Sequence, residues 1–213
     1  MADVTLHVPE PATVFDLVTL EEAKIGLGLS LTTVDPTLDR QLEFLISMQS
    51  AVVAGMCATV FARERVIESW RETQTDKLGQ RLFLTHWPVD DADIEMVTSN
   101  GTTLTSGQWE LEERSGKLSN YNGWSEPAIV TYTGGYDLPD DAPMALKQAT
   151  ISLVRDQRRQ ILLGNLEGIR SIGHKGARVQ FYDPTKLMAA GIGGSAAEKA
   201  ARSLLQPFIR YWL

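Results

Sequence analysis

The chain has 213 residues, of which 43% are hydrophobic, enough for one good core or for a core with a small subdomain. It has no long apolar run, no basic and apolar start and only one cysteine, which argues against a transmembrane helix, a secretory signal, an intrachain disulfide and a cysteine metal cluster. The single cysteine favours a protein made for a reducing cytoplasm. The formal net charge is −7.

The charge is unevenly spread along the chain. Residues 1–142 contain 23 acidic and 9 basic side chains, a net −14, whereas residues 143–213 contain 4 and 11, a net +7. Surfaces of opposite sign can meet between copies of a chain or face different partners. The alternative is a chance fluctuation on solvated faces.

The N-terminal third predicts an arm and two helices. Residues 1–16 contain two prolines and little periodicity, which favours an extended N-terminal arm. Thr19 and Glu22 have the spacing of a capping box, so we expect a short helix from Leu20 to about Leu29. Asp35-Pro36 is a strong helix start. The helix that follows should run to about Ala58 with a broad apolar stripe: Leu38, Leu42, Leu45, Ile46, Val52, Val53 and Met56.

The next stretch, at about 60–133, changes to strand patterns separated by glycine turns. Asn100-Gly101 is the best short hairpin signal that a sequence offers. We therefore expect an antiparallel β insert between two helices, closing through a strand at 128–133. The other strand candidates are 60–70, 81–84, 94–99, 109–112 and 117–118.

A long helix should follow this insert. Gly134-Gly135 ends the strand, Asp140 or Asp141 can cap, and Pro143 suits a first helical turn. Apolar residues then recur at helical spacing as far as residue 163. This helix is the expected packing partner of the helix at 36–58.

Residues 164–194 contain seven glycines and one strand-like stretch at 178–182, which predicts a flexible Gly-rich segment. The chain then closes with a helix behind a second capping box, Ser195 to Glu198, and Pro207 should kink or break it. Its apolar face consists of Ala201, Leu204, Leu205, Phe208, Ile209 and Trp212.

No pattern of catalytic residues is present in the sequence. Cys57 ends an apolar helix and reads as a buried structural thiol rather than a nucleophile. Gly134-Gly135-Tyr136 lacks the further glycines or lysine of a phosphate loop. The histidines have no metal-type spacing, and the aspartate clusters are better explained by turns and caps: His7, His86, His174, Asp90, Asp91, Asp93, Asp137, Asp140 and Asp141. We therefore predict no catalytic site, metal site or cofactor.

Two further residue sets have competing interpretations. Arg155, Arg158 and Arg159 could meet DNA phosphates, but three arginines on one helix more often form a solvated face or pair with a neighbour. The tryptophans of the insert are expected mainly in a small core, with one or two as possible interface anchors: Trp70, Trp87, Trp109 and Trp124.

The order of three blocks resembles the head–tail connector (adaptor, or head-completion) proteins of tailed bacteriophages or related prophage-derived particles. The first is LVTLEEAK followed by a helix with DRQLEFLI, within 17–58. The second is TYTGGYD, a proline and a helix with LKQA near its start, within 128–163. The third is SLLQPFIRYW at 203–212, and RLFLTHWPV is similar to the β insert of longer members.

This resemblance implies an α+β fold with a core of about four helices, a β insert between the second and third helices, and no enzymatic activity. It implies a ring, probably of twelve copies, beneath the portal protein, which connects the capsid to the tail and extends the DNA channel. The expected partners are other copies, the portal, a tail or stopper protein, and genomic DNA that passes without sequence-specific binding, with no membrane. The expected location is the virion neck, after assembly in the host cytoplasm.

On this reading, residues 17–163 are the helical core with its insert, and residues 195–213 are a docking tail. The candidate portal-docking residues are Leu204, Leu205, Phe208, Ile209, Arg210, Tyr211 and Trp212. Arg155, Arg158 and Arg159 are candidates for a subunit interface or the DNA channel. The alternative for the tail is that it closes the protein's own core. The alternatives for the whole protein are a DNA-binding packaging factor, or a small enzyme or ligand-binding domain with an unrecognised site.

Overall fold

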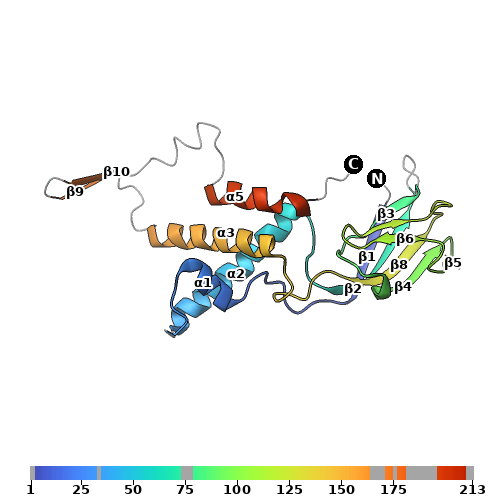
Figure 1. Ribbon diagram of the computed structural model, residues 1–213, viewed down its shortest axis with the longest axis horizontal. Helices are drawn as coiled ribbons and strands as arrows, with labels where there is room; N and C mark the ends of the chain where they lie inside the picture. Colours follow the sequence, from blue (N-terminus) through green and yellow to red (C-terminus); the bar gives the residue numbers. More distant parts are fainter. Residues whose placement is uncertain are drawn as a thin grey trace. The chain divides into compact units, whose positions relative to one another are not determined.

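The computed structural model describes residues 3–32, 35–72, 79–163, 171–174, 177–180 and 196–209. The chain divides into two compact units (Figure 1). We call Met1–Asp16 with Ala58–Ala142 the β unit, and Leu17–Cys57 with Pro143–Leu213 the helical unit. The described α-helices and antiparallel sheets, with most of the described strands between the second and third helices, confirm the predicted α+β class.

The first two helices begin where the sequence predicts. Helix α1 (Leu20–Leu27) starts with the expected capping box, because Thr19 Oγ1 accepts from the Glu22 N–H and the Glu22 carboxylate accepts from the Thr19 N–H. Helix α2 (Pro36–Cys57) is capped by Asp35, whose Oδ1 accepts from the next free N–H groups. The other described α-helices are α3 (Met144–Leu163) and α5 (Ala196–Leu205).

Helices α2 and α3 pack together, as predicted, and α1 covers both. Leu42, Leu45 and Ile46 of α2 lie in one buried cluster with Val154 of α3. Half-buried ion pairs hold α1 in place: Lys24 to Asp39 and Lys147 to Glu22, each at 2.6 Å. At Gly26 an added Cβ would lie 2.5 Å from Ile151 Cγ2, so α1 approaches α3 closely only because glycine stands there.

The β unit contains two antiparallel sheets. The larger sheet has the order β1-β2-β8-β4-β5 and the smaller has β3-β7-β6. The strands of the larger sheet are β1 (Asp3–Glu10), β2 (Glu64–Arg71), β8 (Ala128–Gly134), β4 (Ile94–Ser99) and β5 (Thr102–Thr103). Those of the smaller sheet are β3 (Arg81–Phe83), β7 (Lys117–Ser119) and β6 (Glu110–Glu112), and a short 3₁₀ turn, η1 (Asp91–Asp93), precedes β4.

The turn between β4 and β5 confirms the strongest hairpin signal in the sequence. Asn100 and Gly101 have φ values of 48° and 72°. Positive φ at both central residues is typical of the two-residue turn that matches the twist of antiparallel strands.

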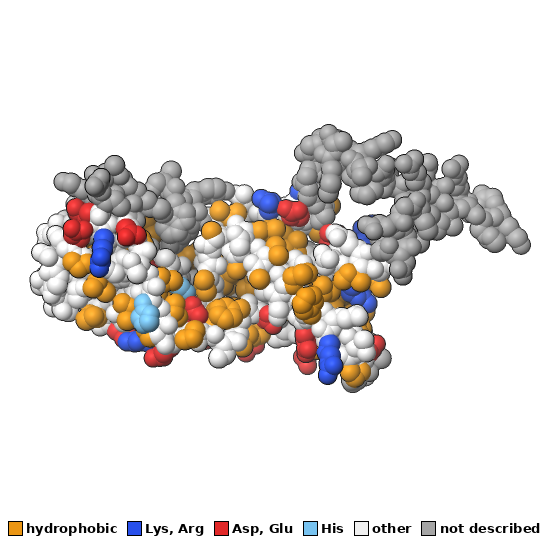
Figure 2. All heavy atoms as spheres, turned by 180° about the vertical axis from the view of Figure 1, so that it is seen from behind, with side chains coloured by type: hydrophobic (Ala, Val, Ile, Leu, Met, Phe, Trp, Pro, Cys, Tyr) orange, Lys and Arg blue, Asp and Glu red, His pale blue; other side chains and the backbone are white. Residues whose placement is uncertain are grey.

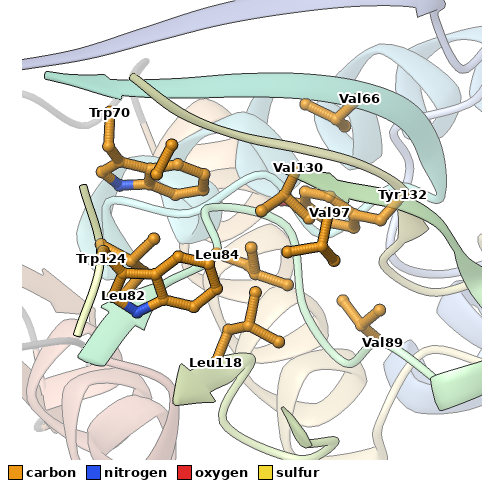
Figure 3. Packing of buried hydrophobic residues seen from close by; sticks show 11 residues of the cluster. Val66, Trp70, Leu82, Leu84, Val89, Val97, Leu118, Trp124, Val130 and Tyr132 are labelled. Atoms are coloured by element: carbon orange, nitrogen blue, oxygen red, sulfur yellow. The ribbon is translucent and has the colours of Figure 1, made fainter. Parts of the chain in front are cut away.

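The core of the β unit lies between its sheets and takes up the predicted tryptophans (Figure 3). Trp70 and Trp124 are each 4% exposed and point into one cluster, and Trp109 packs at its edge. Trp87 is also buried. The remaining members of this cluster are Val66, Leu82, Leu84, Val89, Val97, Leu118, Ala128, Val130 and Tyr132.

The glycine pair at the end of β8, Gly134 and Gly135, has a structural role. Gly135 has a φ of 108°, and a Cβ there would lie 2.3 Å from the carbonyl oxygen of Ala62. Its N–H donates to the Pro88 carbonyl at 2.9 Å, and the next N–H, of Tyr136, donates to Phe61 at 2.7 Å. Glycine is needed here because two backbone segments approach too closely for any side chain.

The structure differs from the sequence predictions at two strands. Residues 3–10, expected as an extended arm, form β1, which pairs with β2 at the edge of the sheet. A strand expected at 178–182 is β10 (Ala177–Gln180), and its partner β9 (Ser171–His174) was not expected. The rest of 164–194, the Ser195 cap, Arg210, Tyr211 and Trp212 lie outside the described residues.

The packing of α2 gives a matched pair of substitutions. Leu45 is 4% exposed, and its neighbour Phe44 is 69% exposed. Leu45→Ala should lower the free energy of unfolding by about 2–5 kcal/mol, because it leaves a cavity in the helical core. Phe44→Ala should change the free energy of unfolding of the isolated protein by less than about 0.5 kcal/mol. Urea denaturation compares the two, and equal losses would contradict the packing described here.

Candidate functional sites

The tail helix α5 packs against α3 and α2, within the helical unit (Figure 1). Ala201 and Leu205 are fully buried, which makes the inner edge of the predicted apolar face part of the unit's own core. The α-helix ends at Leu205 and a 3₁₀ turn, η3 (Gln206–Phe208), contains Pro207, as the proline predicts. Leu204, Phe208 and Ile209 remain half-buried.

The three arginines of α3 have different surroundings. The Arg155 guanidinium donates to the Gly26 carbonyl at the end of α1. Arg158 is half-buried and Arg159 is exposed. Within the described part of the chain, neither of these two has an ion-pair partner, so their charges are available to another molecule.

The β unit contains a buried polar cluster that the sequence analysis did not find. Glu68 is fully buried, and its Oε1 accepts from the Thr85 N–H at 2.8 Å and from the Tyr132 hydroxyl. His86 is 1% exposed, and its Nε2 lies 2.9 Å from Glu64 Oε2. The Thr85 hydroxyl contacts both Glu68 and His86 Nδ1 and thus joins the two halves of the cluster.

The environment of this cluster suits structure better than acid–base chemistry. Burial lowers the pKa of His86, although the Glu64 hydrogen bond and charge oppose this effect. Burial and the Glu68 carboxylate raise the pKa of Tyr132 far above its ordinary value. All four ionisable side chains are buried, so a substrate would have no direct access to them: Glu64, Glu68, His86 and Tyr132.

The sequence did contain a signal for this cluster. Glu64, Val66, Glu68 and Trp70 alternate along β2, and all four are buried, whereas the positions between them are only half-buried. Two glutamates on the same face as valine and tryptophan indicate buried carboxylates with fixed donors. The donors come from residues 12, 85, 86 and 132, which no local pattern connects with β2.

The other sequence candidates have structural surroundings. Burial raises the pKa of the Cys57 thiol to about 11, which makes the thiolate a minor species at neutral pH. Asp93 pairs with Arg63 at 2.7 Å. In the described ranges, no group of three or more His, Cys, Asp or Glu side chains could hold a metal ion. None of the described helices has both the length and the hydropathy of a membrane span.

Comparison with solved structures gives matches to chains of gene transfer agent (GTA) particles. One, from the neck of an empty GTA particle computed with C6 symmetry, has a TM-score of 0.55 and 14% identity over 98% of this chain and 97% of that one. A chain in the virion of the native particle gives 0.54 and 14% over 98% and 96%. A chain in the neck of the native particle computed with C12 symmetry gives 0.50 and 15% over 98% and 97%. No protein-family model and no curated protein matches the sequence. At this identity, the matches show a shared fold across both units.

The buried cluster gives a prediction on stability. Glu68→Ala should lower the free energy of unfolding by about 2–5 kcal/mol, because it removes the acceptor of three donors, the Thr85 N–H and the hydroxyls of Thr85 and Tyr132. Glu68→Gln keeps an oxygen for those donors, so its loss should be less than half as large. Glu113→Ala, at an exposed position of the same unit, is the control. Chemical denaturation measures all three, and equal effects of the two Glu68 variants would contradict an acceptor role.

The lowered pKa of His86 gives a prediction on pH. The folded pKa lies below the unfolded value of 6.5, so the unfolded chain binds a proton more readily. The contribution of neutral His86 to the free energy of unfolding is therefore complete above about pH 6.5. It is lost as the pH falls through the folded pKa of His86. Wild type should lose more stability than His86→Gln between pH 7 and pH 5, as followed by denaturant midpoints. Parallel pH profiles of the two proteins would refute this assignment.

Proposed function

We propose that this chain is a structural neck protein of a tailed, phage-like particle. In this role, copies form a ring beneath the portal, connect the capsid to the tail and extend the DNA channel. The supporting observation is the structural match to GTA neck chains, because it covers 98% of the sequence and includes both units. The connector resemblance of the sequence points to the same role.

The proposed location is the neck of the virion, reached after assembly in the host cytoplasm. The partners are further copies of the chain, the portal, and a tail or stopper protein. Twelve copies is the number we propose, and it agrees with the C12 symmetry of one matched neck. DNA would pass through the channel without sequence-specific contacts, and the protein would have no enzymatic activity. Arg155, Arg158 and Arg159 would line either the channel or the contact between copies.

The ring can be tested directly. The chain and the portal protein of the same particle would be purified together and imaged by electron microscopy, with native mass spectrometry to count copies. We expect a ring of twelve copies attached to the portal. A chain that stays monomeric at every concentration and does not bind the portal would refute the proposal.

The tail is the proposed portal contact. Leu204, Phe208 and Ile209 are half-buried at the end of the helical unit, and Arg210, Tyr211 and Trp212 follow them in the sequence. Tryptophan, tyrosine and arginine are the residue types that most often dominate interfaces. Leu205 is fully buried, so in this conformation it would support the tail rather than meet the portal.

Deletion of residues 207–213 tests the docking role. The buried anchors of α5, Ala201 and Leu205, stay in place, so we expect a melting temperature within a few degrees of wild type. Binding to the portal should be lost. Ala201→Glu is the matched comparison, because it places a charge in the helical core and should lower the melting temperature strongly. If the deleted protein unfolds, or still binds the portal, the tail is not the docking element.

A further inference from the structure

Helix α2 is apolar on two opposite sides, and within the described residues one side is buried and the other is mostly exposed. Its buried positions are Leu42, Leu45, Ile46, Gln49, Ser50, Val53 and Cys57. A second set recurs at i, i+3, i+4, i+7, i+8 and i+11, which places its members on one face of a helix. We call this set the outer stripe: Phe44, Ser47, Met48, Ala51, Val52 and Gly55.

Apart from Met48, which is half-buried against the core of the helical unit, the outer stripe faces solvent. Phe44 is 69% exposed and Val52 is 38% exposed. No charged residue occurs between Glu43 and Arg63 in the sequence, although the solvent side of a surface helix ordinarily carries charges. Figure 2 shows hydrophobic side chains gathered over the helical unit, with few charges among them. An apolar helix face of this length is typical of a surface that another protein covers.

The far end of α3 has the complementary properties. Ile161 and Leu162 are 59% and 64% exposed, and Arg158 and Arg159 precede them. The outer stripe begins directly after the exposed Glu43, which has no ion-pair partner within the described residues. Each surface thus joins an apolar patch to an unpaired charge, and the two charges have opposite signs. Complementary charges set the register and favour the correct partner at an interface.

We propose that the outer stripe of α2 binds the end of α3, Arg158 to Leu162, of a second copy of this chain. Ile161 and Leu162 would pack on Phe44, and an arginine would approach Glu43. The contact is heterologous, because each copy uses two different surfaces, and such contacts can close into rings. This inference rests on the proposed function, since it identifies the contact by which the ring forms.

Gly55 fits this assignment. A Cβ added there would have nothing within 4 Å, so the packing of its own chain does not require glycine at this position. Glycine in a helix is also less favourable than alanine. A second copy whose α3 continues along the stripe from Phe44 towards Gly55 gives a reason for the missing side chain. Because a side chain at position 55 has room in the single copy, Gly55→Leu can block the surface without disturbing the fold.

Two single variants and their mixture test the contact. Phe44→Glu damages the outer stripe, Ile161→Glu damages the α3 end, and Tyr121→Glu, 71% exposed on the β unit, is the control. Sedimentation velocity would follow the full chain over a range of concentrations at low and high salt. We expect wild type and the control to associate, more strongly at low salt, and each of the other variants to associate at least tenfold more weakly with an unchanged melting temperature.

The mixture is the decisive measurement. Phe44→Glu retains a sound α3 end and Ile161→Glu retains a sound stripe, so an equimolar mixture has one working contact. It should form a one-to-one dimer and nothing larger. If either variant fails to fold, Gly55→Leu replaces Phe44→Glu, and Leu162→Ser replaces Ile161→Glu.

The outcomes separate the inference from the proposed function. If wild type associates and both variants still do so, or if the mixture stays monomeric, the contact is refuted while the ring stands. If the variants associate more strongly than wild type, the stripe is covered by the chain's own tail and not by a second copy. The contact is then refuted, while the ring stands. If wild type never associates, alone or on the portal, both the contact and the ring are refuted.

Discussion

The packing of α2 against α3 is the contact on which the helical unit depends, because these helices come from two distant parts of the chain. Val154 of α3 lies in the same buried cluster as Leu42 and Ile46 of α2. The chain between the two helices is closed by the antiparallel pairing of β2, which follows α2, with β8, which precedes α3. Within the helical unit and within the β unit alike, contacts thus join segments that are far apart in sequence.

The β unit has to bury carboxylates to form its sheet. Glu64 and Glu68 lie on the inner face of β2, and burying an ionised carboxylate costs several kcal/mol, by order of magnitude, unless fixed donors surround it. Thr85, His86 and Tyr132 supply donors from two other segments, and the Ala12 N–H donates to Glu64 from a third. The cluster therefore specifies how these segments meet, and it contributes specificity as much as stability.

Local patterns predicted those parts of the fold that have local causes. The Thr19 capping box, the Asp35 cap and the Asn100-Gly101 turn depend on neighbours in sequence, and all three form as predicted. Strand β1 was missed although Val4, Leu6 and Val8 alternate with polar residues, because Pro9 and Pro11 favoured an extended arm. Its pairing with β2 makes this stretch a strand. The Glu68 cluster was missed because its donors lie 17 and 64 residues away in sequence. For the tail, spacing alone could not separate Leu205, which is buried, from Leu204, which is partly exposed.

The distribution of exposed apolar residues on the helical unit constrains how copies can assemble. If the outer stripe met the same stripe on another copy, the contact would be isologous and the assembly would stop at a dimer. Glu43 would then lie near its own counterpart or near no opposite charge, and the patch around Ile161 would stay uncovered. A contact between the stripe and the α3 end pairs both patches and both charges, and it leaves each copy with one of each surface for its next neighbour. Repeated with a constant rotation that closes, this arrangement would produce a ring. The proposed contact uses no residue of α5, whose end is the proposed portal contact.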